Sequence, residues 1–163
     1  MLTPQATTLA WSDSATVTFA SLFVGTALVA GDDPADGDTD AIRTTRVGTT
    51  VNGPFSTNAN ISGTTATLVN AGLDTSDITF VAGTTSGTLT FYVQVCEERP
   101  ASSNAVCAVT TVTVTSTECL DNADCDGTFV CQIGATVLEN TCVPCLNTVG
   151  GAKATSPARG LIS

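Results

Sequence analysis

The sequence predicts an all-β protein: an antiparallel two-sheet sandwich followed by a small disulfide-rich module. Three observations lead to this prediction. Threonine is the most frequent residue, with 31 among 163, and its β-branched side chain suits a pleated strand better than a helix. Short alternating apolar segments recur between turn residues. All seven cysteines lie in the second half of the chain, at positions 96, 107, 119, 125, 131, 142 and 145.

The segments expected to form strands follow one another at short intervals. Ala15–Ala20 alternates between apolar and polar residues, and Ser21–Ala30 is apolar on both faces, as in a central strand. Gly, Asn and Pro separate further short strands, expected at 42–51, 55–62, 64–70 and 78–82. This number of short strands is typical of two packed sheets. No amphipathic helix of useful length is expected.

The clearest expected hairpin joins Thr88–Val95 to Val106–Thr117. Apolar and polar residues alternate along both segments, but Val109 is out of phase with Val112, which predicts a β-bulge. Cys96 and Cys107 flank the connecting loop. Antiparallel partners at the mouth of a hairpin come within disulfide range, so a Cys96–Cys107 bond is expected.

This hairpin resembles the final hairpin of an immunoglobulin-like or cadherin-like domain. The residues that carry the resemblance are Leu89-Thr-Phe-Tyr-Val-Gln-Val95 and Val109-Thr-Thr-Val-Thr-Val-Thr115. The resemblance implies an extracellular, immunoglobulin-like sandwich over residues 1–117. The Cys…Trp…Cys core of antibody domains is absent, because Trp11 precedes every cysteine.

The five cysteines from Cys119 onward define a separate module over residues 118–145. Their spacing lacks the paired CxxC motifs of a zinc ribbon, so disulfides in an oxidising compartment explain them better than a metal. Five cysteines cannot all pair within the module. Any four can be joined in three ways, and any of the five can be the one left over.

Asp124-Cys125, Gly127 and Cys131 are similar to the pattern of small Dickkopf-N-terminal or EGF-like cysteine-rich modules. The spacing before Cys131 and the long segment between Cys131 and Cys142 depart from that pattern. The resemblance implies the bonds Cys119–Cys131 and Cys125–Cys142 and leaves Cys145 as the odd cysteine. Cys145 is then a free thiol, has a partner outside these residues, or forms an intermolecular bond.

Charge and composition argue against several functions. The formal net charge is −10 with only five basic residues, which disfavours nucleic acid because binding phosphates requires clustered Lys and Arg. The chain contains no His, so Ser-His-Asp and Cys-His catalytic arrangements are excluded, and we expect no enzyme. The apolar run from Ala15 to Ala30 is shorter than the roughly 20 residues of a membrane span, and none is expected.

An acidic loop is the candidate metal site. It lies within Gly31–Asp40, where alternate carboxylates around a Gly suit the several oxygen ligands of Ca²⁺; the alternative is a solvated acidic loop. The candidate calcium ligands are Asp32, Asp33, Asp36, Asp38 and Asp40. The segment from Asn122 to Gly127 matches the start of a calcium loop less well, since Ile133 stands where a closing Glu belongs. Asn60-Ile-Ser62 is a candidate N-glycosylation sequon.

The sequence as a whole predicts a structural subunit of an extracellular filament, sheath or surface layer. Copies of the chain are expected to join through sheet edges and through the tail, residues 146–163, whose Lys153 and Arg159 would meet the acidic surface of a neighbour. The alternative is a calcium-dependent adhesion module, or a carbohydrate- or protein-binding module, of a secreted surface protein. No basic segment of a signal peptide follows Met1, so the export signal is expected to have been removed or to lie outside these residues.

Overall fold

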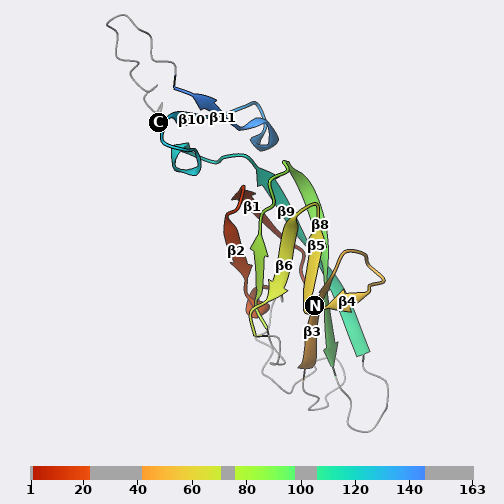
Figure 1. The fold of residues 1–163 in the computed structure, drawn as a ribbon. Helices are drawn as coiled ribbons and strands as arrows, with labels where there is room; N and C mark the ends of the chain where they lie inside the picture. Colours follow the sequence, from red (N-terminus) through yellow and green to blue (C-terminus); the bar gives the residue numbers. More distant parts are fainter. Residues whose placement is uncertain (1, 23–41, 71–75, 98–105, 146–163) are drawn as a thin grey trace, which may run out of the picture.

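Two β-sheets pack face to face in the computed structural model, which describes residues 2–22, 42–70, 76–97 and 106–145 (Figure 1). The larger sheet has the strand order β1-β9-β8-β3-β4 and the smaller one the order β2-β7-β6-β5. A two-stranded ribbon, β10-β11, follows in a unit that carries two disulfides. The predicted all-β sandwich with a C-terminal disulfide-rich module is therefore confirmed.

The strands are short except in the central hairpin. The larger sheet contains β1 (Gln5–Ala10), β3 (Ile42–Gly48), β4 (Phe55–Ser56), β8 (Gly87–Glu97) and β9 (Val106–Thr117). The smaller sheet contains β2 (Ser14–Val17), β5 (Asn58–Ile61), β6 (Thr64–Leu68) and β7 (Ile78–Val81). The ribbon consists of β10 (Phe129–Gln132) and β11 (Thr141–Pro144).

Helical structure in the described part of the chain is limited to three 3-10 turns, η1 (Phe19–Leu22), η2 (Asn122–Asp124) and η3 (Val137–Glu139). No helix among the described residues has the length and apolar character that a membrane span needs. The strands carry the architecture because Thr and Val, which dominate them, fit a pleated surface.

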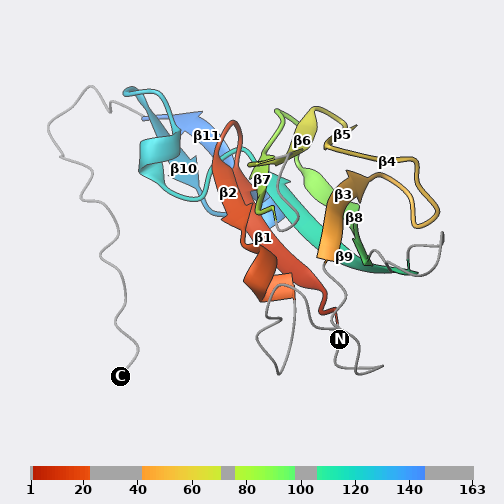
Figure 2. The same cartoon turned by 90° about the horizontal axis from the view of Figure 1, so that it is seen from below.

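Both sheets combine strands that are far apart in the sequence. β9, β8 and β3 lie side by side in the larger sheet, and β2, β7 and β6 lie side by side in the smaller one. The chain changes sheet between β1 and β2 on one side of the sandwich and between β4 and β5 on the other (Figures 1 and 2). Each side of the sandwich is therefore bounded by short strands that continue from one sheet into the other.

The β8–β9 hairpin is formed as predicted, but without a bulge. Its register is unbroken from Gly87 opposite Ser116 to Glu97 opposite Val106. Val109 is on the outer face of the sheet and is 37% exposed, whereas Val112 is fully buried. The phase change that suggested a bulge is a valine on the solvent side of a regular strand. The register shift of this sheet lies in β3 instead, between Ile42 and Thr44.

β1 is a strand that the sequence pattern did not predict. It pairs in parallel with the second half of β9, from Gln5 opposite Val112 to Ala10 opposite Thr117. Its Leu9 and Ala10 are buried. Its composition, Gln-Ala-Thr-Thr-Leu-Ala, alternates too weakly for a local pattern to identify a strand.

The strand expected over Ala15–Ala20 ends early. β2 stops at Val17, and the chain then turns through η1. Two hydrogen bonds fix this turn: the backbone N–H of Phe19 donates to Oδ1 of Asp77 at 2.8 Å, and that of Ser21 donates to the carbonyl of Thr18 at 3.0 Å. The strand expected over Ser21–Ala30 does not begin within η1, and its remainder lies outside the described residues.

Side chains from both sheets form one apolar core. Phe80 on β7 and Phe91 on β8 are fully buried, and their rings meet edge to face with centroids 5.4 Å apart. Such aromatic pairs contribute about 0.5–1.5 kcal/mol beyond the area they bury. The other members of the core are Leu9, Leu22, Val47, Ala66, Leu68, Ile78, Ala82, Val93, Val95, Val112 and Val114.

Candidate functional site: the cysteine module and the open sheet edge

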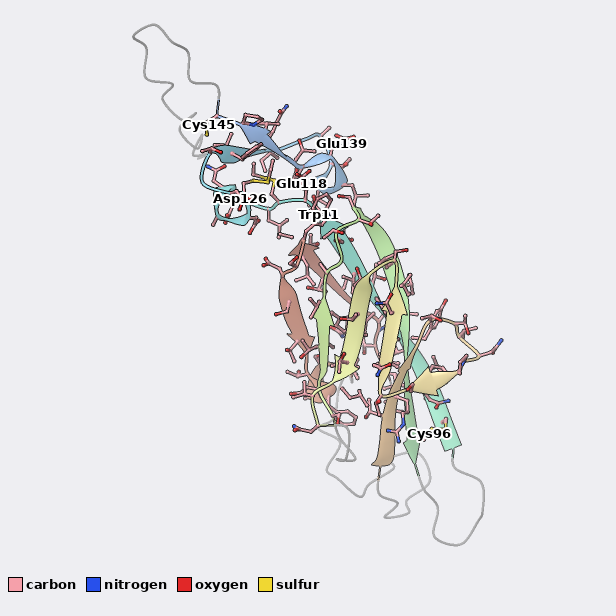
Figure 3. All side chains as sticks on the ribbon, viewed as in Figure 1. Trp11, Cys96, Glu118, Asp126, Glu139 and Cys145 are labelled. Atoms are coloured by element: carbon pink, nitrogen blue, oxygen red, sulfur yellow. A yellow bond between two sulfur atoms is a disulfide. The ribbon has the colours of Figure 1, made fainter. Side chains whose placement is uncertain are left out.

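The far end of the long hairpin is closed by the Cys96–Cys107 disulfide. The two residues are directly opposite each other in the β8–β9 register, with Cα atoms 4.1 Å apart. This is the bond expected from the sequence. It holds together the end of the hairpin that is remote from the cysteine module, as the position of Cys96 in Figure 3 shows.

The cysteine module is organised by its own short-range hydrogen bonds. Asp121 caps η2 by accepting from the N–H of Ala123 at 2.7 Å. Oδ2 of Asp124 accepts from the N–H groups of Leu120 and Asp121, at 2.6 and 3.0 Å. Oδ1 of Asn122 accepts from the N–H of Cys131 at 2.9 Å. The side-chain oxygens of Asn122 and Asp124, which belong to the weaker candidate calcium loop, thus accept hydrogen bonds that stabilise the turn.

Two interleaved disulfides, Cys119–Cys131 and Cys125–Cys142, cross the module. They are the pairs implied by the resemblance to small cysteine-rich modules. The Sγ atoms of Cys119, Cys125 and Cys142 all lie within 4.8 Å of one another. This proximity follows from two disulfides lying side by side. Because a metal binds the thiolate form of cysteine, sulfurs already joined in disulfides are not metal ligands.

The module is attached to the end of β9 through buried polar contacts. The hydroxyl of Thr117 donates to the carbonyl of Val137 at 2.6 Å, and the amide of Asn140 donates to the carbonyl of Cys119 at 3.0 Å. Thr117 and Cys119 are fully buried, and Asn140 is 4% exposed. No sequence pattern identified Asn140 as a structural residue, because its role depends on contacts made across the module.

Cys145 has no disulfide partner and is exposed. It directly follows β11, and its backbone N–H donates to the carbonyl of Thr128 at 2.8 Å. The hydrogen bond extends the β10–β11 ribbon by one position, so the thiol is presented from an ordered backbone at the end of the module (Figure 3). The tail that follows, residues 146–163, lies outside the described residues.

The module also carries exposed apolar side chains. Ile133 is 64% exposed and Phe129 is 38% exposed. Phe129 is opposite Pro144 in the ribbon, and Pro144 immediately precedes Cys145. The other exposed apolar residues of the module are Leu120, Val137 and Leu138. The thiol of Cys145 therefore directly follows the end of the ribbon that carries the exposed ring of Phe129.

The second notable feature is an uncovered length of strand. β8 pairs with β9 from Val106 to Ser116, but β1 pairs only with Val112–Thr117. Among the residues that the structure describes, no strand pairs with the other side of Val106–Thr111. We call this segment the open edge. Cys107, Ala108 and Val109 within it are all exposed.

Asn60, the candidate glycosylation site, is exposed on the edge strand β5. Its Oδ1 accepts from the N–H of Gly63 at 3.2 Å. The position is accessible to a glycan. The candidate calcium ligands Asp32, Asp33, Asp36, Asp38 and Asp40 lie outside the described residues.

No protein-family model, no curated protein and no solved structure matches this chain. The fold itself defines the class: an all-β, disulfide-bonded protein with two main sheets. The resemblance of its module to Dickkopf-N-terminal or EGF-like modules stays a prediction.

Proposed function

We propose that this protein is a structural subunit of an extracellular filament, sheath or surface layer that is built from copies of itself. The observation that carries the proposal is that the described part of one disulfide-bonded molecule has both a cysteine without a disulfide partner and a strand edge without a neighbouring strand. Cys145 is an exposed thiol without a partner at one end, and the open edge of β9 is an uncovered strand near the other. Both features are suited to joining further chains.

The extracellular assignment is supported by the cysteines. Six of the seven are paired in three disulfides, and such bonds persist in oxidising compartments but are rare in a reducing cytosol. Cys145 is then exposed in an environment that favours disulfide formation with a second chain. A small module with few buried apolar residues also depends on such bonds for its stability.

The distribution of charge is compatible with close packing of copies. The acidic residues give a net charge of −10, yet the strands of the described part of the chain contain only three charged residues, Arg43, Arg46 and Glu97. Neutral sheet faces reduce the repulsion between copies that a net charge of this size would otherwise produce.

The test is the state of the protein after secretion and purification under non-reducing conditions. We expect polymers by negative-stain microscopy and sedimentation, and bands larger than the monomer on non-reducing gels. Cys145→Ser is expected to remove the covalent bands and to leave the three intramolecular disulfides in place. A dispersed monomer at high protein concentration, with one titratable thiol, would overturn the proposal.

A calcium-dependent adhesion module is the second candidate. It is favoured by the five aspartates between Asp32 and Asp40, which offer several carboxylate oxygens within nine residues. The two proposals differ in what each requires. Adhesion requires a calcium-dependent fold or ligand, whereas a structural subunit requires self-association.

A further inference from the structure

The geometry of the hairpin shows which backbone groups the open edge presents. Cys96 and Cys107 are opposite each other with Cα atoms only 4.1 Å apart. In antiparallel sheets, such a short separation marks a pair that is not hydrogen-bonded across the two strands. The N–H and C=O groups of Cys107 therefore point away from β8. By the alternation of the ladder, those of Val109 and Thr111 also point away from β8, toward the side of the open edge.

The open edge lacks the features that normally prevent a strand from pairing with another chain. Its sequence, Val-Cys-Ala-Val-Thr-Thr, contains no charged residue and no proline, which are the usual protections of sheet edges. The remaining edges are shorter, flanked or charged. Among the described residues, β3 pairs with β4 only at Val47 and Gly48, and its uncovered part, Ile42–Arg46, contains two arginines. β4 has two residues and follows Pro54, and β2 and β5 have four each. β1 lies against β2, and the amide of Gln5 donates to the carbonyl of Ser21 at 2.7 Å.

The open edge and the module lie at opposite ends of β9. The twelve residues of β9 separate its two ends by about 36 Å, at about 3.3 Å per residue. Figure 3 shows Cys96, beside the open edge, far from Cys145 in the module. A segment that continues from Cys145 in one copy is therefore placed to reach the open edge of the next copy in a head-to-tail arrangement.

We propose that residues 158–163 of one copy add as a strand to the open edge, Val106–Thr111, of the next copy. This inference rests on the proposed function and specifies the non-covalent contact between neighbouring copies. Repeated head-to-tail contacts of this kind generate an open polymer when they do not close into a ring. The strand would supply partners for the outward N–H and C=O groups of Cys107 and Val109 and for the outward N–H of Thr111, whose C=O faces Gln5 of β1.

The sequence of the tail supports this choice of occupant. Ala158-Arg-Gly-Leu-Ile-Ser163 is as long as the open edge and includes two adjacent apolar residues, Leu161 and the β-branched Ile162. The twelve residues from 146 to 157 extend to at most about 40 Å, which matches the length of β9.

Charge complementarity points to the same pairing. Residues 146–163 contain Lys153 and Arg159 and no acidic residue, so the tail has a formal charge of +2. The remainder of the chain holds three basic residues against all fifteen acidic ones, a formal charge of −12. Glu97 is at the register position opposite Val106, at the end of the open edge. The tail is thus attracted to the body of a neighbouring copy.

The acceptor is tested in the full chain with Val109→Pro. This substitution removes an N–H that points into the open edge and leaves the hydrogen bonds to β8 in place, a position where an edge strand tolerates proline. Val109→Ala is the matched control, because it shortens the same side chain but keeps the N–H. Sedimentation and light scattering measure the protein concentration at which polymers first form. We expect this concentration to be at least tenfold higher for Val109→Pro than for Val109→Ala.

The donor is tested with the double variant Leu161→Asp, Ile162→Asp, which is also expected to lose polymers. Mixing it in equal amounts with Val109→Pro leaves one intact tail and one intact open edge in each pair of chains. The mixture should form dimers that do not grow, which analytical ultracentrifugation detects.

The outcomes separate this inference from the proposed function. A wild-type chain that stays monomeric overturns the proposed function. A wild-type chain that polymerises while Val109→Pro behaves as Val109→Ala overturns the acceptor. Polymers that persist in the double aspartate variant overturn the donor. Loss in both variants, together with mixed dimers, supports the proposal.

Discussion

The side-chain amide of Asn140 donates a 3.0 Å hydrogen bond to the carbonyl oxygen of Cys119, and both residues are buried. Its Oδ1 accepts from the backbone N–H of Gly134, also at 3.0 Å. One side chain thus links the segment before η3 to the first cysteine after β9. Together with the hydrogen bond from Thr117 to Val137, this bond holds the module against the end of the sandwich.

Asn140→Ala is expected to lower the free energy of unfolding of the module by about 2 kcal/mol, because it leaves a buried carbonyl and a partly buried N–H without partners. Asn122→Ala is the matched control in the same module. Asn122 is exposed, and its side-chain oxygen accepts a hydrogen bond from the N–H of Cys131, so loss of this side chain should cost less than about 1 kcal/mol. Urea unfolding under oxidising conditions measures both, and equal losses would contradict the role given to Asn140.

Replacing Cys125 and Cys142 together by Ala is expected to unfold the module and spare the sandwich. The bond closes a loop with a sequence separation of 17, and loops of this size gain about 3 kcal/mol from closure. Hydrogen exchange should show lost protection in β10 and β11 and retained protection in β8 and β9. Cys145→Ala, the control without a disulfide, should leave both protected. Exposure of the sandwich amides in the double variant would show that the two units fold as one.

Phe80→Ala is expected to destabilise the sandwich by about 3–5 kcal/mol, since it opens a cavity between the two sheets. The adjacent Val81→Ala is the control, because Val81 is 37% exposed on the outer face, where substitutions usually change stability by about 0.5 kcal/mol or less. A double-mutant cycle of Phe80→Leu and Phe91→Leu should give a coupling of about 0.5–1.5 kcal/mol from the edge-to-face rings. Zero coupling would contradict the ring contact; chemical denaturation provides all four values.

Millimolar Ca²⁺ is expected to raise the melting temperature by a few degrees if the acidic run binds the ion. At ten times the dissociation constant, binding to the folded state adds about 1.4 kcal/mol. Asp36→Asn, Asp38→Asn and Asp40→Asn together should abolish the shift, while Asp121→Ala, outside the run, should preserve it. Identical melting curves with Ca²⁺ and with a chelator would remove the calcium site and the adhesion proposal that depends on it.

The hairpin and the disulfides show how much of the structure can be predicted from residues that are close together in the sequence. Alternation from Leu89 to Val95 and from Val112 to Val114 specified two strands that are neighbours in sequence, and Cys96 and Cys107 marked where they pair. Alternation misled at Val109, where an apolar residue lies on the outer face of a regular strand. It misled again at Phe19, where hydrogen bonds to Asp77 and Thr18 replaced a strand by a 3-10 turn.

The sequence by itself determined the β class, the central hairpin with its Cys96–Cys107 bond, and the presence of a separate cysteine module with one cysteine too many. Each of these depends on residues close together in the chain or on simple counts. Only the tertiary structure decided that β1 pairs in parallel with Val112–Thr117 and leaves Val106–Thr111 open. Strands that are far apart in the sequence pair when their apolar side chains enter a common core, as Leu9 and Val114 do here. The apolar pattern within either strand does not identify its partner.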